Sequence, residues 1–247
     1  EGLEQNFSRT AFPWSVDMEL LSPSHLFWLA LTVLFVMGCF HMRRLDLASR
    51  WHRLFRAALF VVVAANEIAW FSYRHVAGAI PFVKNLPLPL CDLPVFIMLF
   101  TLVTAKKRLA ELSYYMGAVG ALLAVCFPAI SETGSIRLIA EIRYFITHIA
   151  LIGVGVYFTF GRGYHPELGA IFRSFGFILL YALLVTPLNL MLDTNYFFTL
   201  AAPAQLGFIH QYPHWLFLAV TSLIFLCAFA LLHLPFALQR RRAGAAH

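Results

Sequence analysis

Charge is scarce in this chain of 247 residues. Charged residues make up only 12% of it, whereas soluble domains carry roughly 25%. Hydrophobic residues make up 61%, and the mean hydropathy is +0.77. This composition excludes an ordinary soluble fold, and we expect an integral membrane protein.

Cysteine and lysine are also rare, and each shortage excludes a kind of site. The four cysteines form no Cys-x-x-Cys pair, which excludes a zinc-finger framework. Lys84, Lys106 and Lys107 are the only lysines, and all three fall in predicted loops. A retinal Schiff base needs a buried lysine, so a rhodopsin-like function is excluded. We expect no cofactor.

Apolar residues are gathered in long stretches. Crossing ~30 Å of hydrocarbon takes about 20 residues of helix, and seven stretches are long enough: 24–42, 57–73, 86–104, 112–130, 144–161, 174–192 and 214–236. The sequence therefore predicts an all-α membrane protein, a single bundle of seven transmembrane helices that occupies residues 1–247.

The basic residues predict the orientation of this bundle. One set of alternating loops holds thirteen arginines and lysines, and the other set holds five. Because basic loops stay on the cytoplasmic side, we expect the N-terminus outside and the C-terminus in the cytoplasm. The net charge of +6 then lies against anionic lipid headgroups, and nucleic-acid binding is not expected. The preference for arginine over lysine and the short loops favour a bacterial cytoplasmic membrane.

Cys91 and His148 are the candidate catalytic pair. Pro89 suits a first helical turn, and Cys91 then falls within that turn, where free amides stabilise a thiolate. His148 lies about as far from the start of another stretch that runs in the same direction. Both side chains are thus expected at one depth, about 6 to 8 Å below the extracytoplasmic surface. An imidazole-activated thiolate attacks acyl carbonyls, so the pair predicts acyl chemistry near the outer leaflet.

Other polar residues are predicted on the same side of the membrane. Glu67 and Asp92 each offer a carboxylate to the pair, although a structural role for a protonated Glu67 is equally well supported. Thr147 is expected to hydrogen-bond within its own helix. The remaining supporting residues are Asn66, for which an interhelical hydrogen bond is the favoured alternative, His25, Asn189 and Asn195.

Four segments together resemble the YwaF-like integral membrane family: Leu-Ser-Pro-Ser-His at 21–25, Leu-Pro-Leu-Pro-Leu-Cys-Asp-Leu at 86–93, Arg-Tyr-Phe-Ile-Thr-His at 143–148, and 188–203. The resemblance covers residues 20–236. The animal relative of that family is a transmembrane acyltransferase that builds polyunsaturated ether phospholipids. The resemblance implies that Cys91 carries the acyl group and that His148 activates it. Pro89 departs from the family pattern, in which we expect a polar residue or histidine.

Three functions remain open from the sequence. The first is a membrane-embedded acyltransferase that moves a fatty acyl chain from a phospholipid, through acyl-Cys91, to a lysophospholipid or another lipid acceptor. The second is a zinc-dependent seven-helix lipid hydrolase, in which His210 and His214, four residues apart, join His148 as metal ligands. The third is a lipid transporter or binding protein.

Overall fold

A computed structural model describes residues 18–76, 86, 88, 92–128, 130, 136–202 and 209–244, the side chains of 241–244 excepted. Regular structure in these ranges is entirely helical. The helices are α2 (Pro23–His41), α3 (Arg50–Val76), α4 (Asp92–Thr104), α5 (Lys107–Leu112), α6 (Ala118–Cys126), α7 (Arg137–Val156), α8 (Gly169–Leu192) and α9 (His214–Gly244). Short turns are the 3-10 helices η2 (Met42–Arg44) and η7 (Tyr196–Phe198) and the π-helical turns η4 (Ser113–Gly117) and η6 (Tyr157–Gly161).

The helices confirm the predicted membrane protein, although one of the seven predicted spans is a shorter helix. Six helical rods in the described part are long and apolar enough to cross a membrane. The seventh predicted span, 86–104, contributes only the 13 residues of α4, which at 1.5 Å per residue extend about 20 Å of the ~30 Å needed. Helices α3 and α7 begin about two turns before the predicted spans, at Arg50 and Arg137. A span predicted from hydropathy leaves out these charged first turns, whereas the backbone hydrogen bonds of the helix include them.

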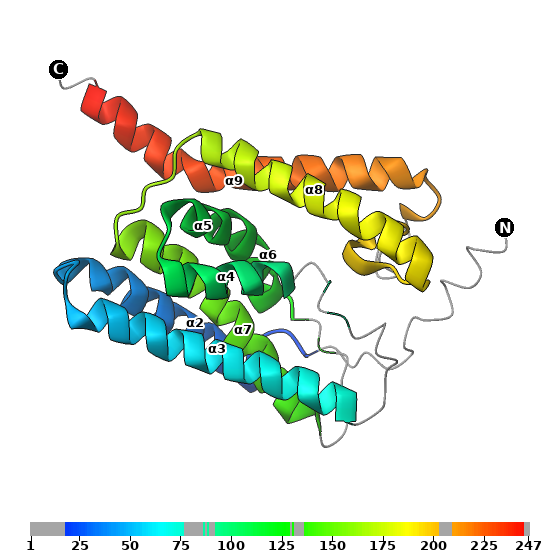
Figure 1. Cartoon of the computed structure of the whole chain (residues 1–247), viewed down its shortest axis with the longest axis horizontal. Helices are drawn as coiled ribbons and strands as arrows, with labels where there is room; N and C mark the ends of the chain where they lie inside the picture. Colours follow the sequence, from blue (N-terminus) through cyan, green and yellow to red (C-terminus); the bar gives the residue numbers. More distant parts are fainter. Residues whose placement is uncertain are drawn as a thin grey trace.

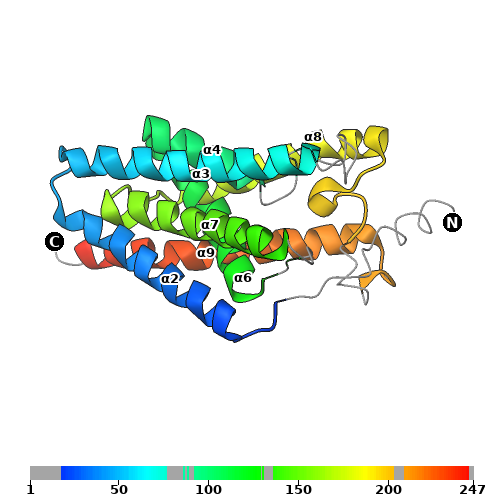
Figure 2. The ribbon, with the colours of Figure 1, turned by 90° about the horizontal axis from the view of Figure 1, so that it is seen from below.

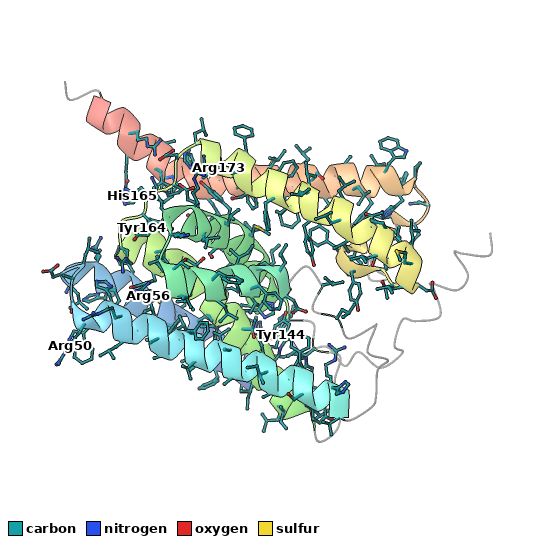
Figure 3. The ribbon with its side chains drawn as sticks, in the orientation of Figure 1. Arg50, Arg56, Tyr144, Tyr164, His165 and Arg173 are labelled. Carbon is teal, nitrogen blue, oxygen red and sulfur yellow. The ribbon has the colours of Figure 1, made fainter. Side chains whose placement is uncertain are left out.

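The seven rods alternate in direction, with η4 joining α5 and α6 into one of them (Figures 1 and 2). We use "basic end" for the end of the bundle at which α2 stops and α3 starts. Most of the described arginines and lysines lie there, among them Arg50, Arg56 and Arg173 (Figure 3). The opposite end holds the start of α7 and of α9.

Helix α7 is the centre of the bundle. It contacts α2, α3, α4, α5, η4 and α6. In the most apolar part of Arg137–Gly161, 78% of the residues are buried, against 11% in His214–Arg240. Close packing explains Gly153, at which an added Cβ would lie 2.2 Å from the Phe35 ring of α2. A side chain on α7 can therefore meet partners from most of the fold.

Helices α8 and α9 lie side by side along one flank of the molecule (Figure 1). They contact η4, α5 and α6 and leave many large apolar side chains exposed, for example Leu183, Leu190 and Leu231. Such a surface suits contact with lipid chains. The structure therefore supports a bilayer partner for the chain.

Candidate functional site

A buried ionic cluster joins three helices in the half of the bundle away from the basic end. Arg143 Nη2 of α7 lies 2.6 Å from Glu67 Oε2 of α3 and 3.6 Å from Asp92 Oδ1 of α4. The three side chains are only 18%, 10% and 13% exposed, respectively. One arginine thus serves two carboxylates, and the cluster carries a formal net charge of −1. The sequence prediction assigned Arg143 to an outer loop, which is wrong because α7 begins six residues earlier, at Arg137.

A threonine hydroxyl binds the second oxygen of Glu67, and an asparagine in turn binds that hydroxyl. Thr147 Oγ1 donates to Glu67 Oε1 at 2.5 Å, and Asn66 Nδ2 donates to Thr147 Oγ1 at 3.0 Å and to the Arg143 carbonyl at 3.3 Å. The expectation that Thr147 bonds within its own helix is therefore wrong. The interhelical hydrogen bond expected as the alternative for Asn66 is present. Glu67 accepts from both an arginine and a hydroxyl, so both carboxylate oxygens have donors.

His148 is 3% exposed and lies one turn beyond Tyr144 on α7. Its Nδ1 is 2.7 Å from the Tyr144 carbonyl oxygen. A carbonyl only accepts, so Nδ1 carries the ring hydrogen of the neutral imidazole and Nε2 holds a lone pair. Nε2 is buried and has no hydrogen-bond partner in the described structure. The imidazole is thus held in one orientation through Nδ1, and its basic nitrogen Nε2 is free.

The Tyr144 ring fixes the face of the imidazole. The two ring centroids lie 4.2 Å apart, and the Tyr144 hydroxyl donates to the Ala124 carbonyl of α6 at 3.0 Å. Figure 3 shows Tyr144 in the half of the bundle away from the labelled arginines. The base is thus held by its backbone and by a tyrosine that is itself anchored.

Cys91 lies outside the described residues, but chain neighbours on both sides of it are described. Asp92, the next residue, begins α4 and lies at Arg143. Leu88, three residues earlier, accepts a hydrogen bond at its carbonyl from Tyr181 of α8 at 3.0 Å. These contacts tie the two flanks of residue 91 to α7 and α8.

A pocket of about 340 Å³ opens between α3 and α4 beside the ionic cluster. Its wall is largely apolar, and its polar residues are Glu67, Ser72 and Asp92. Ile68 and Phe96, which are 66% and 41% exposed, line it from the outer surface of the helices. The pocket has the size and lining for a hydrocarbon chain that enters from the lipid side.

In three other residues predicted to support the site, the polar side-chain atoms are all used in hydrogen bonds that stabilise the fold. His25 Nδ1 accepts from the Leu21 amide at 3.0 Å, and its Nε2 lies 2.9 Å from the Val125 carbonyl. The Asn189 side chain donates to the Tyr196 carbonyl and Thr199, and accepts from Thr194 and the Tyr196 amide.

Asn195 accepts from the amides of Leu200 and Ala201 and donates to the Ala201 carbonyl. Together with Asn189 it fixes the loop after α8, which includes Phe197 and Phe198 at positive φ. This loop also carries Tyr196, which is hydrogen-bonded to the Leu86 backbone. Burial raises the pKa of Tyr196 above its ordinary value, and that hydrogen bond partly opposes the rise. The two asparagines thus fix the loop whose Tyr196 is bound to Leu86.

The proposed zinc ligands do not meet. His214 Nε2 is bound to the Thr199 carbonyl at 2.9 Å at the start of α9, and His210 is exposed in the preceding turn. His148 is buried on α7. Across the described part of the chain, no three His, Cys, Asp or Glu side chains form a group able to hold a metal. The alternative ligand set His148, His210 and His214 is therefore wrong.

Glu141 is a buried acid that the sequence prediction missed. It accepts hydrogen bonds from Trp28 Nε1 at 2.7 Å and from the Ser24 hydroxyl of α2. Trp28 also stacks on Phe145, with ring centroids 4.9 Å apart. Glu141 lies seven residues before His148 in the sequence, a spacing that places both on one helical face and was the available signal.

The sequence comparison extends over most of the molecule. The family model of the TMEM164 family matches residues 20–233. No curated protein and no solved structure matches the chain. The match includes every helix of the site from α2 to α8, and the chain therefore belongs to the TMEM164 family.

Proposed function

We propose that this protein is a membrane-embedded acyltransferase with Cys91 as nucleophile and His148 as general base. The observation that carries the proposal is His148 itself: a buried imidazole whose Nδ1–H is bound to a carbonyl and whose Nε2 is unpartnered. A base oriented by one hydrogen bond with its other nitrogen free is the requirement for activating a thiol. The neighbouring Asp92 is tied to Arg143 on the same helix as His148.

The reaction proceeds in two balanced steps. His148 Nε2 takes the thiol proton of Cys91 while the sulfur attacks an ester carbonyl of a phospholipid. The ester C–O bond breaks, and the lysophospholipid leaves as an alcohol with the proton from His148. A hydroxyl of the acceptor lipid then attacks the thioester, its proton passes through His148 to the sulfur, and the free thiol returns.

Two features support lipid esters as substrates. The largely apolar pocket between α3 and α4 suits one acyl chain, and Glu67 and Asp92 are among its lining residues. Arg143 Nε is a buried donor with no acceptor in the described structure, so it can stabilise the oxyanion formed when the carbonyl is attacked. The resemblance to the YwaF-like family and its ether-phospholipid acyltransferase relative points to the same chemistry.

The distribution of basic residues supports an extracytoplasmic location for this chemistry. If the basic end faces the cytoplasm, as the positive-inside rule predicts, the half that holds His148 faces the extracytoplasmic leaflet. The N-terminus then lies outside and the C-terminus inside. We propose a bacterial cytoplasmic membrane as the setting.

Intact-protein mass spectrometry tests the proposal. Purified protein incubated with a phospholipid of defined acyl chain should gain one fatty-acyl mass, which hydroxylamine removes and peptide mapping assigns to residue 91. Cys91→Ala should abolish the adduct, whereas Cys227→Ala, which changes an exposed cysteine, should retain it. An acyl adduct of equal yield in Cys91→Ala contradicts the mechanism.

Product analysis separates the competing functions. With added lysophospholipid, transfer yields a new diacyl lipid, hydrolysis yields free fatty acid, and a transporter or binding protein yields neither. The proposal predicts the diacyl product, lost in Cys91→Ala.

A further inference from the structure

A second polar cluster lies at the basic end, remote from the proposed acyl site. It consists of His52 and Arg56 from the first turns of α3, and Tyr157 and Arg162 from η6 and the residue after it. Figure 3 shows Arg56 and Tyr164 at this end and Tyr144 in the other half of the bundle. The proposed acyl transfer uses none of these residues.

His52 lacks a partner at one nitrogen. The side chain is 1% exposed, and its Nδ1 lies 3.0 Å from the Tyr157 hydroxyl. Its Nε2 is buried without a hydrogen-bond partner in the described structure. The Tyr157 hydroxyl also donates to the His52 carbonyl at 3.5 Å, and the imidazole interacts with the Leu45 backbone. In the tautomer with the ring hydrogen on Nε2, this nitrogen is a buried donor. Leaving such a group unsatisfied costs about 1–3 kcal/mol.

Arg56 and Arg162 are arginines without carboxylates. Both charges act on His52 and on Tyr157, and Arg162 is also hydrogen-bonded to the Tyr157 side chain. No described ion pair includes either arginine. The Nε atom of each is buried and has no partner. The contrast is with Arg143 and Arg173, whose guanidinium nitrogens lie 2.6 and 2.7 Å from carboxylates.

A backbone carbonyl holds Arg56 in place, and an aromatic ring lies against Arg162. Arg56 Nη1 donates to the Leu102 carbonyl at 3.2 Å, and the Arg162 guanidinium lies 5.4 Å from the Tyr164 ring centroid. Arg162 follows directly on the π-helical turn η6, which packs so closely on α2 that a Cβ at Gly161 would lie 2.7 Å from the Cys39 carbonyl. Single π-helical turns are rare and are frequent at functional sites. The donors are thus pre-positioned.

We propose that His52, Arg56 and Arg162 bind a phosphate group at the basic end. The buried Nε–H groups of Arg56 and Arg162 have no hydrogen-bond partner, and neither arginine forms a described ion pair. A phosphate offers several acceptor oxygens and a negative charge to such groups. The residues lie within about two turns of helix ends, the depth at which lipid phosphates meet protein. The phosphate comes either from a phospholipid headgroup or from a soluble phosphate compound. The experiment below distinguishes these two sources.

Native mass spectrometry tests this site by measuring lipid binding to the full chain, purified in a detergent and buffer that contain no phosphate. The probes are dioleoyl phosphatidic acid, dioleoylglycerol, which has the same chains without phosphate, and inorganic phosphate as competitor. We expect Arg56→Gln and Arg162→Gln each to weaken phosphatidic acid binding about tenfold. Arg50→Gln, which changes an exposed arginine on the same helix, should change it less than about twofold.

The competitor distinguishes the two sources. Displacement of phosphatidic acid by millimolar inorganic phosphate indicates a site for soluble phosphate, and retention indicates a lipid site. If Arg56→Gln does not fold, Arg162→Gln and His52→Gln decide the matter. Equal binding of phosphatidic acid and dioleoylglycerol, or unchanged binding by the folded glutamine variants, overturns the proposal.

Discussion

Arg143 Nη2 lies 2.6 Å from Glu67 Oε2 and so ties α7 to α3 at the level of the candidate site. Both side chains are largely buried, and each depends on the other for its charge to be tolerated away from water. Asp92, at 3.6 Å from the same nitrogen, extends the tie to the first residue of α4. The cluster thus fixes the start of α4, next to Cys91, against the helix that carries His148.

Glu67→Gln should destabilise the fold because the buried Arg143 loses its closer carboxylate and keeps only Asp92, at 3.6 Å. Breaking such a buried pair costs about 3 kcal/mol or more, which should appear as a clear drop in the thermal midpoint in detergent. The control is Glu167→Gln, which breaks the exposed pair with Lys107. The Lys107 hydrogen bond lowers the pKa of Glu167, but solvent screens this pair and the midpoint should not move. Equal midpoint changes in the two variants count against a stabilising role for the cluster.

Thr147→Val should remove the hydroxyl that connects Asn66 to Glu67 while keeping the shape of the side chain. The loss leaves the Asn66 amide and one Glu67 oxygen short of partners, at a cost of about 1–3 kcal/mol. Thr147→Ser keeps the hydroxyl and should retain most of the stability. Denaturation of the two variants in parallel measures their stabilities. A valine variant as stable as the serine variant would show that the hydroxyl does not stabilise the fold.

Tyr181→Phe should lower the rate of acyl transfer more than it lowers stability. The hydroxyl holds the Leu88 carbonyl at 3.0 Å, and its loss frees one flank of the segment that contains Cys91. A neutral hydrogen bond of about 1 kcal/mol corresponds to a rate loss of roughly fivefold. The control is Tyr212→Phe at an exposed tyrosine. A single-turnover assay of acyl adduct formation measures the effect, and equal rates in the two variants contradict a positioning role.

His148→Gln should slow acyl adduct formation by about 10²- to 10⁴-fold, the range for loss of a general base. His210→Gln, at an exposed histidine in the turn before α9, should form the adduct at the wild-type rate. Release of free fatty acid by the same two variants tests the zinc-hydrolase alternative again, since a zinc hydrolase that uses His148 and His210 would lose hydrolysis in both.

Sequence patterns predicted the helices well because seven long apolar stretches leave few alternatives. They also placed Glu67, Asp92 and His148 at similar depth, and the structure brings the first two together at Arg143. Thr147, inside the predicted span, was assigned a hydrogen bond within its own helix, whereas Arg143 and Glu141 were missed for a common reason. Hydropathy ended the span at the first charges, whereas the helix continues and each polar group finds a partner on a neighbouring helix.

The roles of Asn189 and Asn195 depend on tertiary contacts that no local pattern contains. Both were expected near the site, because Asn189 lies at the outer end of the span 174–192 and Asn195 lies in the outer loop that follows. In the structure they fix the loop between α8 and α9, and Tyr196 of that loop reaches the Leu86 backbone. Such a contact between segments more than a hundred residues apart is set by the packing of α8.

Alkylation of Cys91 tests most directly whether His148 activates its thiol. Wild-type protein and His148→Gln are treated with iodoacetamide at neutral pH, and peptide mapping follows the modification of residue 91, with the exposed Cys227 as internal control. The account predicts that Cys91 reacts about tenfold or more slowly in His148→Gln, because only the thiolate is nucleophilic, while Cys227 reacts equally in both. Equal Cys91 rates in the two proteins would contradict the account.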